Sequence, residues 1–88
     1  MYNDQTTEDK ILILLDEVSD HLPIDDTKNI KEFIEHREWG VGFETLCAQI
    51  FEYNIQISNE FYKKLSAIGE SMDIESFIWT PLEKLIKR

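Results

Sequence analysis

The chain has 88 residues, of which 42% are hydrophobic, enough for one domain with one core. Its 18 acidic and nine basic residues give a net charge of −9. This charge argues against direct binding to nucleic acid or to an anionic membrane, because both ligands require clustered Lys and Arg. It favours a basic partner instead. A lone cysteine precludes an internal disulfide, and no leader, lipidation signal or long apolar run is visible, so we expect a cytoplasmic protein.

Apolar residues recur with helical spacing along nearly the whole chain. A first helix is predicted with Thr6 or Thr7 as its N-cap, and Pro23 ends that segment because a proline forces the preceding residue out of the helical region. The predicted helices cover about residues 8–20, 26–35, 40–53, 58–70 and a last segment from residue 80 onward. The chain therefore predicts an all-α, antiparallel bundle of about five helices, organised as one domain over residues 1–88.

The third predicted helix is the most apolar of the five and is expected to be central in the bundle. Its broad buried face is predicted to contain Phe43, Leu46, Cys47, Ile50 and Phe51. Residues 54–57 alternate between polar and apolar over too short a span for a strand, so we expect an extended connector there. Ser58 is placed to cap the fourth helix. The run Thr80-Pro81-Leu82-Glu83 predicts a capping box with proline at the first position of the last helix.

The sequence offers little for catalysis. Cys47 lies on the apolar face of the third helix, where burial makes a thiol inert. Glu32 and His36 have the spacing of metal ligands on one helix face, but no second histidine and no Cys-x-x-Cys accompanies them. We therefore expect no catalytic residues, no metal and no cofactor, and the chain is predicted not to be an enzyme.

The acidic residues are concentrated in the first half of the chain. Up to residue 38 there are eleven acids and four bases, whereas the remainder has seven acids and five bases. On the first helix the acids lie opposite the core-facing stripe, and Ile13 lies among them, which is typical of a docking surface with a polar rim. A solvated face that only keeps the protein soluble is the alternative. The predicted partner-binding residues are Asp9, Ile13, Asp16, Glu17, Asp20, Asp25 and Asp26, with Glu35, Glu38 and Trp39 as weaker candidates.

The centre of the chain carries a more specific pattern. Residues 32–40 read EFIEHREWG and residues 43–47 read FETLC, preceded by a Leu-Pro step at 22–23 and followed by YNIQIS at 53–58. Over roughly residues 10–80 the sequence resembles the MafI-type immunity proteins of bacterial polymorphic toxin systems, which are small, acidic and helical. Two positions depart from that family's pattern. Arg37 stands where the family usually has Gly, so a left-handed Arg37 should cost about 1 kcal/mol. Gly42 stands where Ala is more frequent, so the third helix is expected to start later.

The resemblance implies a cytoplasmic immunity protein of contact-dependent growth inhibition that binds a cognate toxin C-terminal domain. That domain is expected to be a basic nuclease, in particular an RNase, and the chain is expected to be a monomer or one half of a 1:1 complex. Two alternatives from other classes stay open. One is an acidic mimic of nucleic acid, or another helical interaction module without a toxin partner. The other is an enzyme, against which the lack of any nucleophile–base pair or metal set counts.

Overall fold

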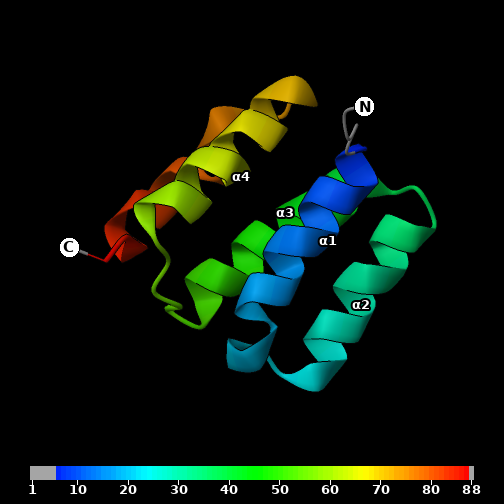
Figure 1. Ribbon diagram of the computed structural model, residues 1–88, viewed down its shortest axis with the longest axis horizontal. Helices are drawn as coiled ribbons and strands as arrows, with labels where there is room; N and C mark the ends of the chain where they lie inside the picture. Colours follow the sequence, from blue (N-terminus) through cyan, green and yellow to red (C-terminus); the bar gives the residue numbers. More distant parts are fainter. Residues whose placement is uncertain (1–5, 88) are drawn as a thin grey trace, which may run out of the picture.

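The computed structural model describes residues 6–87, and within them the chain is all-α. Four α-helices are followed by two short helical turns that close the C-terminal side (Figure 1). The elements are α1 (Thr7–Val18), the 3₁₀ helix η1 (Ser19–His21), α2 (Ile24–Glu35), α3 (Trp39–Glu52), α4 (Asn59–Ser71), and the 3₁₀ helices η2 (Ser76–Ile78) and η3 (Thr80–Leu85). The predicted fold class, a small all-α bundle, is confirmed.

Consecutive α-helices run in alternating directions, as short connections require (Figure 1). Helix α2 packs mainly on α3, whereas α1 contacts α2, α3 and α4. The segments η2 and η3 pack on α3 and α4 and cover the side of the bundle away from α2. Helix α1 therefore lies between α2 and α4, which leaves its outer face to solvent.

The core is built from apolar side chains of every α-helix, and no buried polar or charged side chain interrupts it among the described residues. Phe43 and Trp79 meet edge to face, with ring centroids 6.1 Å apart, and this contact joins α3 to the C-terminal segment. The stripe that the helical spacing predicts for the first helix is buried as expected, and it consists of Ile11, Leu14, Leu15, Val18 and Leu22. The buried apolar residues are Ile11, Leu14, Leu15, Val18, Leu22, Ile30, Ile34, Phe43, Leu46, Cys47, Ile50, Ile55, Ile57, Phe61, Leu65, Ile68, Trp79 and Leu82.

Two helices begin at the caps that the sequence indicates. The Thr6 hydroxyl accepts a hydrogen bond from the Asp9 amide (3.1 Å), and the Ser58 hydroxyl accepts one from the Phe61 amide (2.9 Å). Helix α2 starts two residues earlier than predicted, at Ile24, because Pro23 itself takes the cap position and its carbonyl accepts the first intrahelical bonds. Leu22 is extended, as its place before a proline requires.

Helices α2, α3 and α4 end in the same way, with a non-glycine residue in the left-handed conformation. Arg37, Asn54 and Asp73 have φ values of 64°, 56° and 59°. At the end of α2 the amide of Arg37 donates to the Ile34 carbonyl (3.1 Å) and that of Glu38 to the Phe33 carbonyl (2.8 Å), the hydrogen bonds of a Schellman motif. The conformation considered for Arg37 from the sequence is therefore the one it adopts.

The C-terminal segment differs from its prediction. The last helix is a 3₁₀ helix without a side-chain cap, so the capping box from Thr80 to Glu83 does not form. The reason is register: Trp79 occupies the cap position and its carbonyl accepts from the Leu82 amide (2.9 Å), which places Thr80 inside the first turn. The connector predicted at residues 54–57 begins one residue later, because Asn54 belongs to the left-handed turn that ends α3, and Ile57 forms one parallel bridge with Ile86.

Two expectations for α3 are wrong. Phe51 is 54% exposed, because it lies about 40° beyond Cys47 around the helix, at the edge of the arc that neighbouring elements cover. The helix also starts at Trp39 and not later, with Gly42 buried inside it. A side chain at Gly42 would collide with Ile34, so glycine is what allows α3 to approach α2 this closely.

Candidate protein-interaction surface

The residues considered for catalysis do not form a site. Between residues 6 and 87, no three His, Cys, Asp or Glu side chains are grouped so that they could hold a metal ion. The Nδ1 atom of His36 lies 2.8 Å from the Glu32 carbonyl, and since a carbonyl oxygen can only accept, Nδ1 carries the proton. His36 therefore bonds the backbone of Glu32, not its carboxylate.

Cys47 is buried in the core, as predicted. Burial raises the pKa of its thiol from 9.0 to about 12, and the negative charge of Glu44 acts in the same direction. Because the thiolate is the reactive form, this sulfur is held in its unreactive state at neutral pH.

The acidic face predicted for α1 is on the surface of the molecule. Asp9, Ile13, Asp16 and Asp20 recur at intervals of three or four residues and form one stripe, opposite the buried side of the helix. Glu17 is exposed on the same helix. We call Asp9, Ile13, Asp16, Glu17 and Asp20 the acidic ridge. Its members from Asp9 to Glu17 follow the outer side of α1 for about 12 Å, taking 1.5 Å per residue, and Asp20 continues the ridge in η1, because α1 ends at Val18, two residues earlier than predicted.

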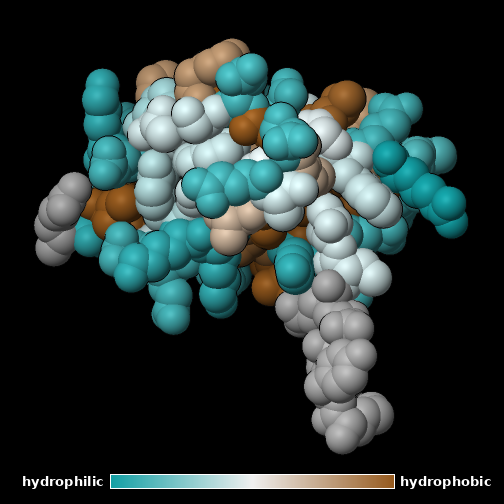
Figure 2. Space-filling model, turned by 90° about the horizontal axis from the view of Figure 1, so that it is seen from above, coloured by the Kyte–Doolittle hydropathy of each residue, from teal (hydrophilic) through white to brown (hydrophobic). Residues whose placement is uncertain are grey.

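Ile13 is the apolar member of the ridge, and 43% of its surface is exposed. Single exposed apolar residues are common, but this one is set among carboxylates on a helix with neighbours on both sides. In Figure 2, hydrophilic side chains likewise surround small, separate hydrophobic areas on the face that is drawn. An apolar centre with a charged rim is the arrangement that protein interfaces use.

The other predicted binding residues lie at the two ends of α2. Asp25 is exposed in its first turn, and Asp26 accepts a hydrogen bond from the hydroxyl of Tyr53 (2.9 Å), which ties the start of α2 to the end of α3. That bond is the main reason why the pKa of Tyr53 is raised. Asp26 thus has a structural contact of its own, whereas Asp25 is directed to solvent.

Glu35 and Glu38 are exposed at the opposite end of α2, roughly 15 Å along the helix from Asp25. Trp39, next to them, is only half-buried, but its ring packs against the core and its Nε1 is enclosed without a hydrogen-bond partner among the described residues. The structure therefore brings the acidic ridge together on α1 and the adjoining η1 and divides the remaining candidates between two separate places.

Sequence reasoning missed the outward face of α3. Val41 and Phe51 are 47% and 54% exposed, and Ala48 lies between them, with Glu44 and Glu52 alongside. The signal was present, since apolar residues surround this helix on more than one side. Of these apolar residues, Phe51 was assigned to the core because α3 was expected to be central in the bundle, and Val41 and Ala48 were given no role.

Comparisons of the chain with protein-family models, with curated proteins and with solved structures found no match. Within the described part of the chain, no helix is both long enough and apolar enough to cross a membrane.

Proposed function

We propose that this chain is an immunity protein that binds a basic toxin domain, in particular a nuclease, and neutralises it stoichiometrically. The observation that carries the proposal is the acidic ridge, an exposed stripe along α1 and η1 with a partly exposed Ile13 among its carboxylates. The net charge of −9 and the sequence pattern at residues 32–47, which resembles MafI-type immunity proteins, support it. A small helical bundle with an inert cysteine suits a protein that acts by binding alone.

The physical basis is complementarity to an enzyme that handles phosphate. A nuclease needs positive charge around its active site, since its substrate carries a charge on every nucleotide. The carboxylates of the ridge steer such a surface toward α1 and raise the association rate, while Ile13 provides apolar contact once water is expelled. Covering the basic surface prevents the nucleic acid from reaching it.

Co-expression with the product of the neighbouring gene tests the proposal, which expects that product to carry a basic toxin domain. We expect the two proteins to co-elute as a 1:1 complex, and we expect nuclease activity in vitro to fall to zero at one equivalent. Cells that express the toxin domain should survive only when this chain is present. Growth arrest despite equal amounts of this chain, or nuclease activity unchanged at a tenfold excess, would contradict the proposal.

A further inference from the structure

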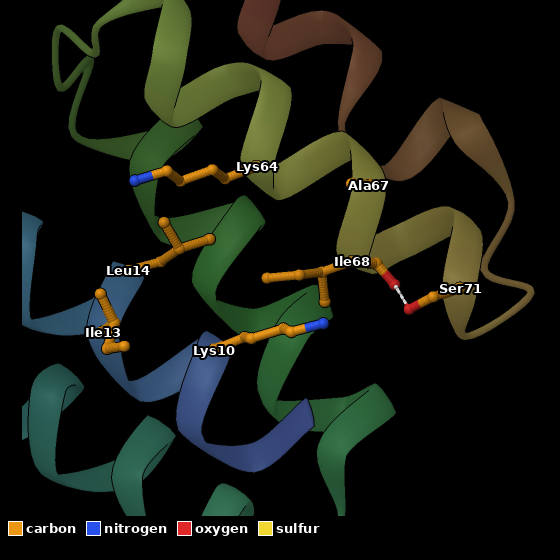
Figure 3. A pocket seen from close by; sticks show the side chains of 7 residues that line it. All are labelled: Lys10, Ile13, Leu14, Lys64, Ala67, Ile68 and Ser71. Carbon is orange, nitrogen blue, oxygen red and sulfur yellow. Dashed lines mark hydrogen bonds between the residues drawn. The ribbon is translucent and has the colours of Figure 1, made fainter. Parts of the chain in front are cut away.

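A groove of about 470 Å³ lies between α1 and α4, beside the acidic ridge. Its floor is apolar, built by Ile13 and Leu14 from α1 and by Ala67 and Ile68 from α4 (Figure 3). The hydroxyl of Ser71 at one end donates to the Ile68 carbonyl (2.8 Å) and is thereby satisfied within its own helix. The groove therefore offers apolar surface and no polar atom from its floor, apart from what its edges contribute.

Those edges are positive. Lys10 lies on the α1 wall and Lys64 on the α4 wall, and in Figure 3 their side chains extend in opposite directions, toward the two ends of the groove. The chain has nine basic residues against 18 acidic ones, whereas the lining of this groove has two lysines and no acidic residue, so its formal charge has the opposite sign to that of the whole protein. Flexible lysine stems can lie over an apolar floor and move aside when another apolar group arrives.

The groove is continuous with the surface proposed for binding, because Ile13 belongs to both. A partner seated on the acidic ridge therefore has the groove within reach of the same contact. The acidic ridge is complementary to basic groups, whereas the groove is complementary to an apolar group with a negative charge beside it.

We propose that the groove between α1 and α4 receives an apolar side chain of the protein partner that carries a carboxylate next to it, and that this carboxylate pairs with Lys10 or Lys64 at the edge of the groove. The identity of the occupant, a side chain of a basic protein, rests on the proposed function. A free anionic amphiphile would be repelled by a protein of charge −9. A carboxylate on a basic protein surface is not, because the positive charges around it are attracted to the acidic protein. The reversal of sign then acts in recognition, since a basic partner without a carboxylate at this place leaves the two lysines facing positive charge.

Two synthetic peptides that differ in one group test this reading without any toxin. Both are blocked, lysine-rich amphipathic helices with a pair of leucines on one face; one carries a glutamate beside the leucines and its twin carries a glutamine. Binding to the isotopically labelled protein is followed by NMR. We expect the glutamate peptide to bind roughly two- to fivefold more tightly, the range of exposed ion pairs. The amide signals of Ile13, Leu14 and Ile68 should shift with it.

The variants locate the effect. In Lys10→Gln/Lys64→Gln the two peptides should bind equally, whereas Lys63→Gln, an exposed lysine of α4 that does not line the groove, should keep the preference. Ala67→Trp fills the groove and should weaken both peptides, with thermal melting as the check that it folds. Equal binding of the two peptides to the wild type overturns the proposal, as do shifts confined to the ridge.

Sodium decanoate below its micelle concentration tests the other source of the same chemistry. Tighter binding of decanoate than of the glutamate peptide assigns the groove to a small amphiphile and contradicts a protein occupant. The proposed function is judged separately: if the peptides discriminate and no toxin is neutralised, the immunity role fails and the groove stands. If the toxin is neutralised and the two peptides bind alike, the immunity role stands and the groove proposal fails.

Discussion

At the residue scale, the C-terminal ends of three helices carry conformational strain, because each needs a residue in the left-handed conformation and none of the three has glycine there. Asn54 and Asp73 tolerate this conformation comparatively well, since their short polar side chains can bond locally. Arg37 has no such compensation. Replacing Arg37 with Gly should therefore stabilise the protein by about 1 kcal/mol, measured by urea unfolding. The matched change Asn54→Gly should gain less, and an Arg37→Gly variant less stable than wild type would contradict this account of the helix end.

Gly69 is a residue at which packing, and not backbone conformation, requires glycine. A side chain there would overlap the ring of Trp79, which packs directly on α4 at this point. Alanine usually favours a helix by up to about 1 kcal/mol over glycine, but a displaced indole in a packed core costs more, typically 1–3 kcal/mol. Gly69→Ala should therefore lower the free energy of unfolding by about 1 kcal/mol, whereas Gly40→Ala, where nothing lies nearby, should not.

Cys47 gives the fold a dependence on alkaline pH. The thiol ionises near pH 9.0 in the unfolded chain, but its pKa in the folded protein is raised to about 12. Its contribution to stability is complete below pH 9 and is lost between pH 9 and 12, at up to about 1.4 kcal/mol per pH unit. The raised pKa values of Tyr53 and Tyr62 act in the same direction.

Denaturant unfolding between pH 8 and 10.5 checks this dependence. Stability should fall above pH 9 in the wild type and fall less steeply in Cys47→Ala, which itself costs about 1 kcal/mol or slightly more at neutral pH. Cys47→Asp should not fold, since it buries a charge. Rapid labelling of native Cys47 by a thiol reagent would show that the residue is not held in the core.

At the element scale, the α-helices could be predicted closely because their signals are local. The hydroxyl caps at Thr6 and Ser58 and the core stripe of α1 depend on residues within one or two turns. What could not be predicted depends on contacts distant in sequence. The exposure of Phe51 follows from which elements cover α3, and Trp79 moves the start of η3 by packing on Phe43 and Gly69. The exposed acids of α1 were predictable for the same local reason, whereas the groove needs α1 and α4 side by side.

At the scale of the whole molecule, the account depends on where the negative charge lies and not only on its sum. The ridge and the groove lie next to each other on α1, so one partner can meet both. If charge alone governed capture, any two acidic residues would serve equally well. If the ridge is the contact, its own carboxylates must matter more than carboxylates elsewhere, and the effect must be strongest at low ionic strength.

The association rate with the toxin domain, measured as a function of salt, tests this most directly. Asp16→Lys/Asp20→Lys is compared with Glu75→Lys/Glu83→Lys, which changes the net charge equally at exposed sites outside the ridge. All variants should keep thermal stability within about 0.5 kcal/mol of wild type. We predict that the ridge variant associates much more slowly at low salt and that the difference fades above ~0.15 M, while the control variant stays close to wild type. Equal rates for the two variants at every salt concentration would contradict the claim that the acidic ridge of α1 is the binding surface.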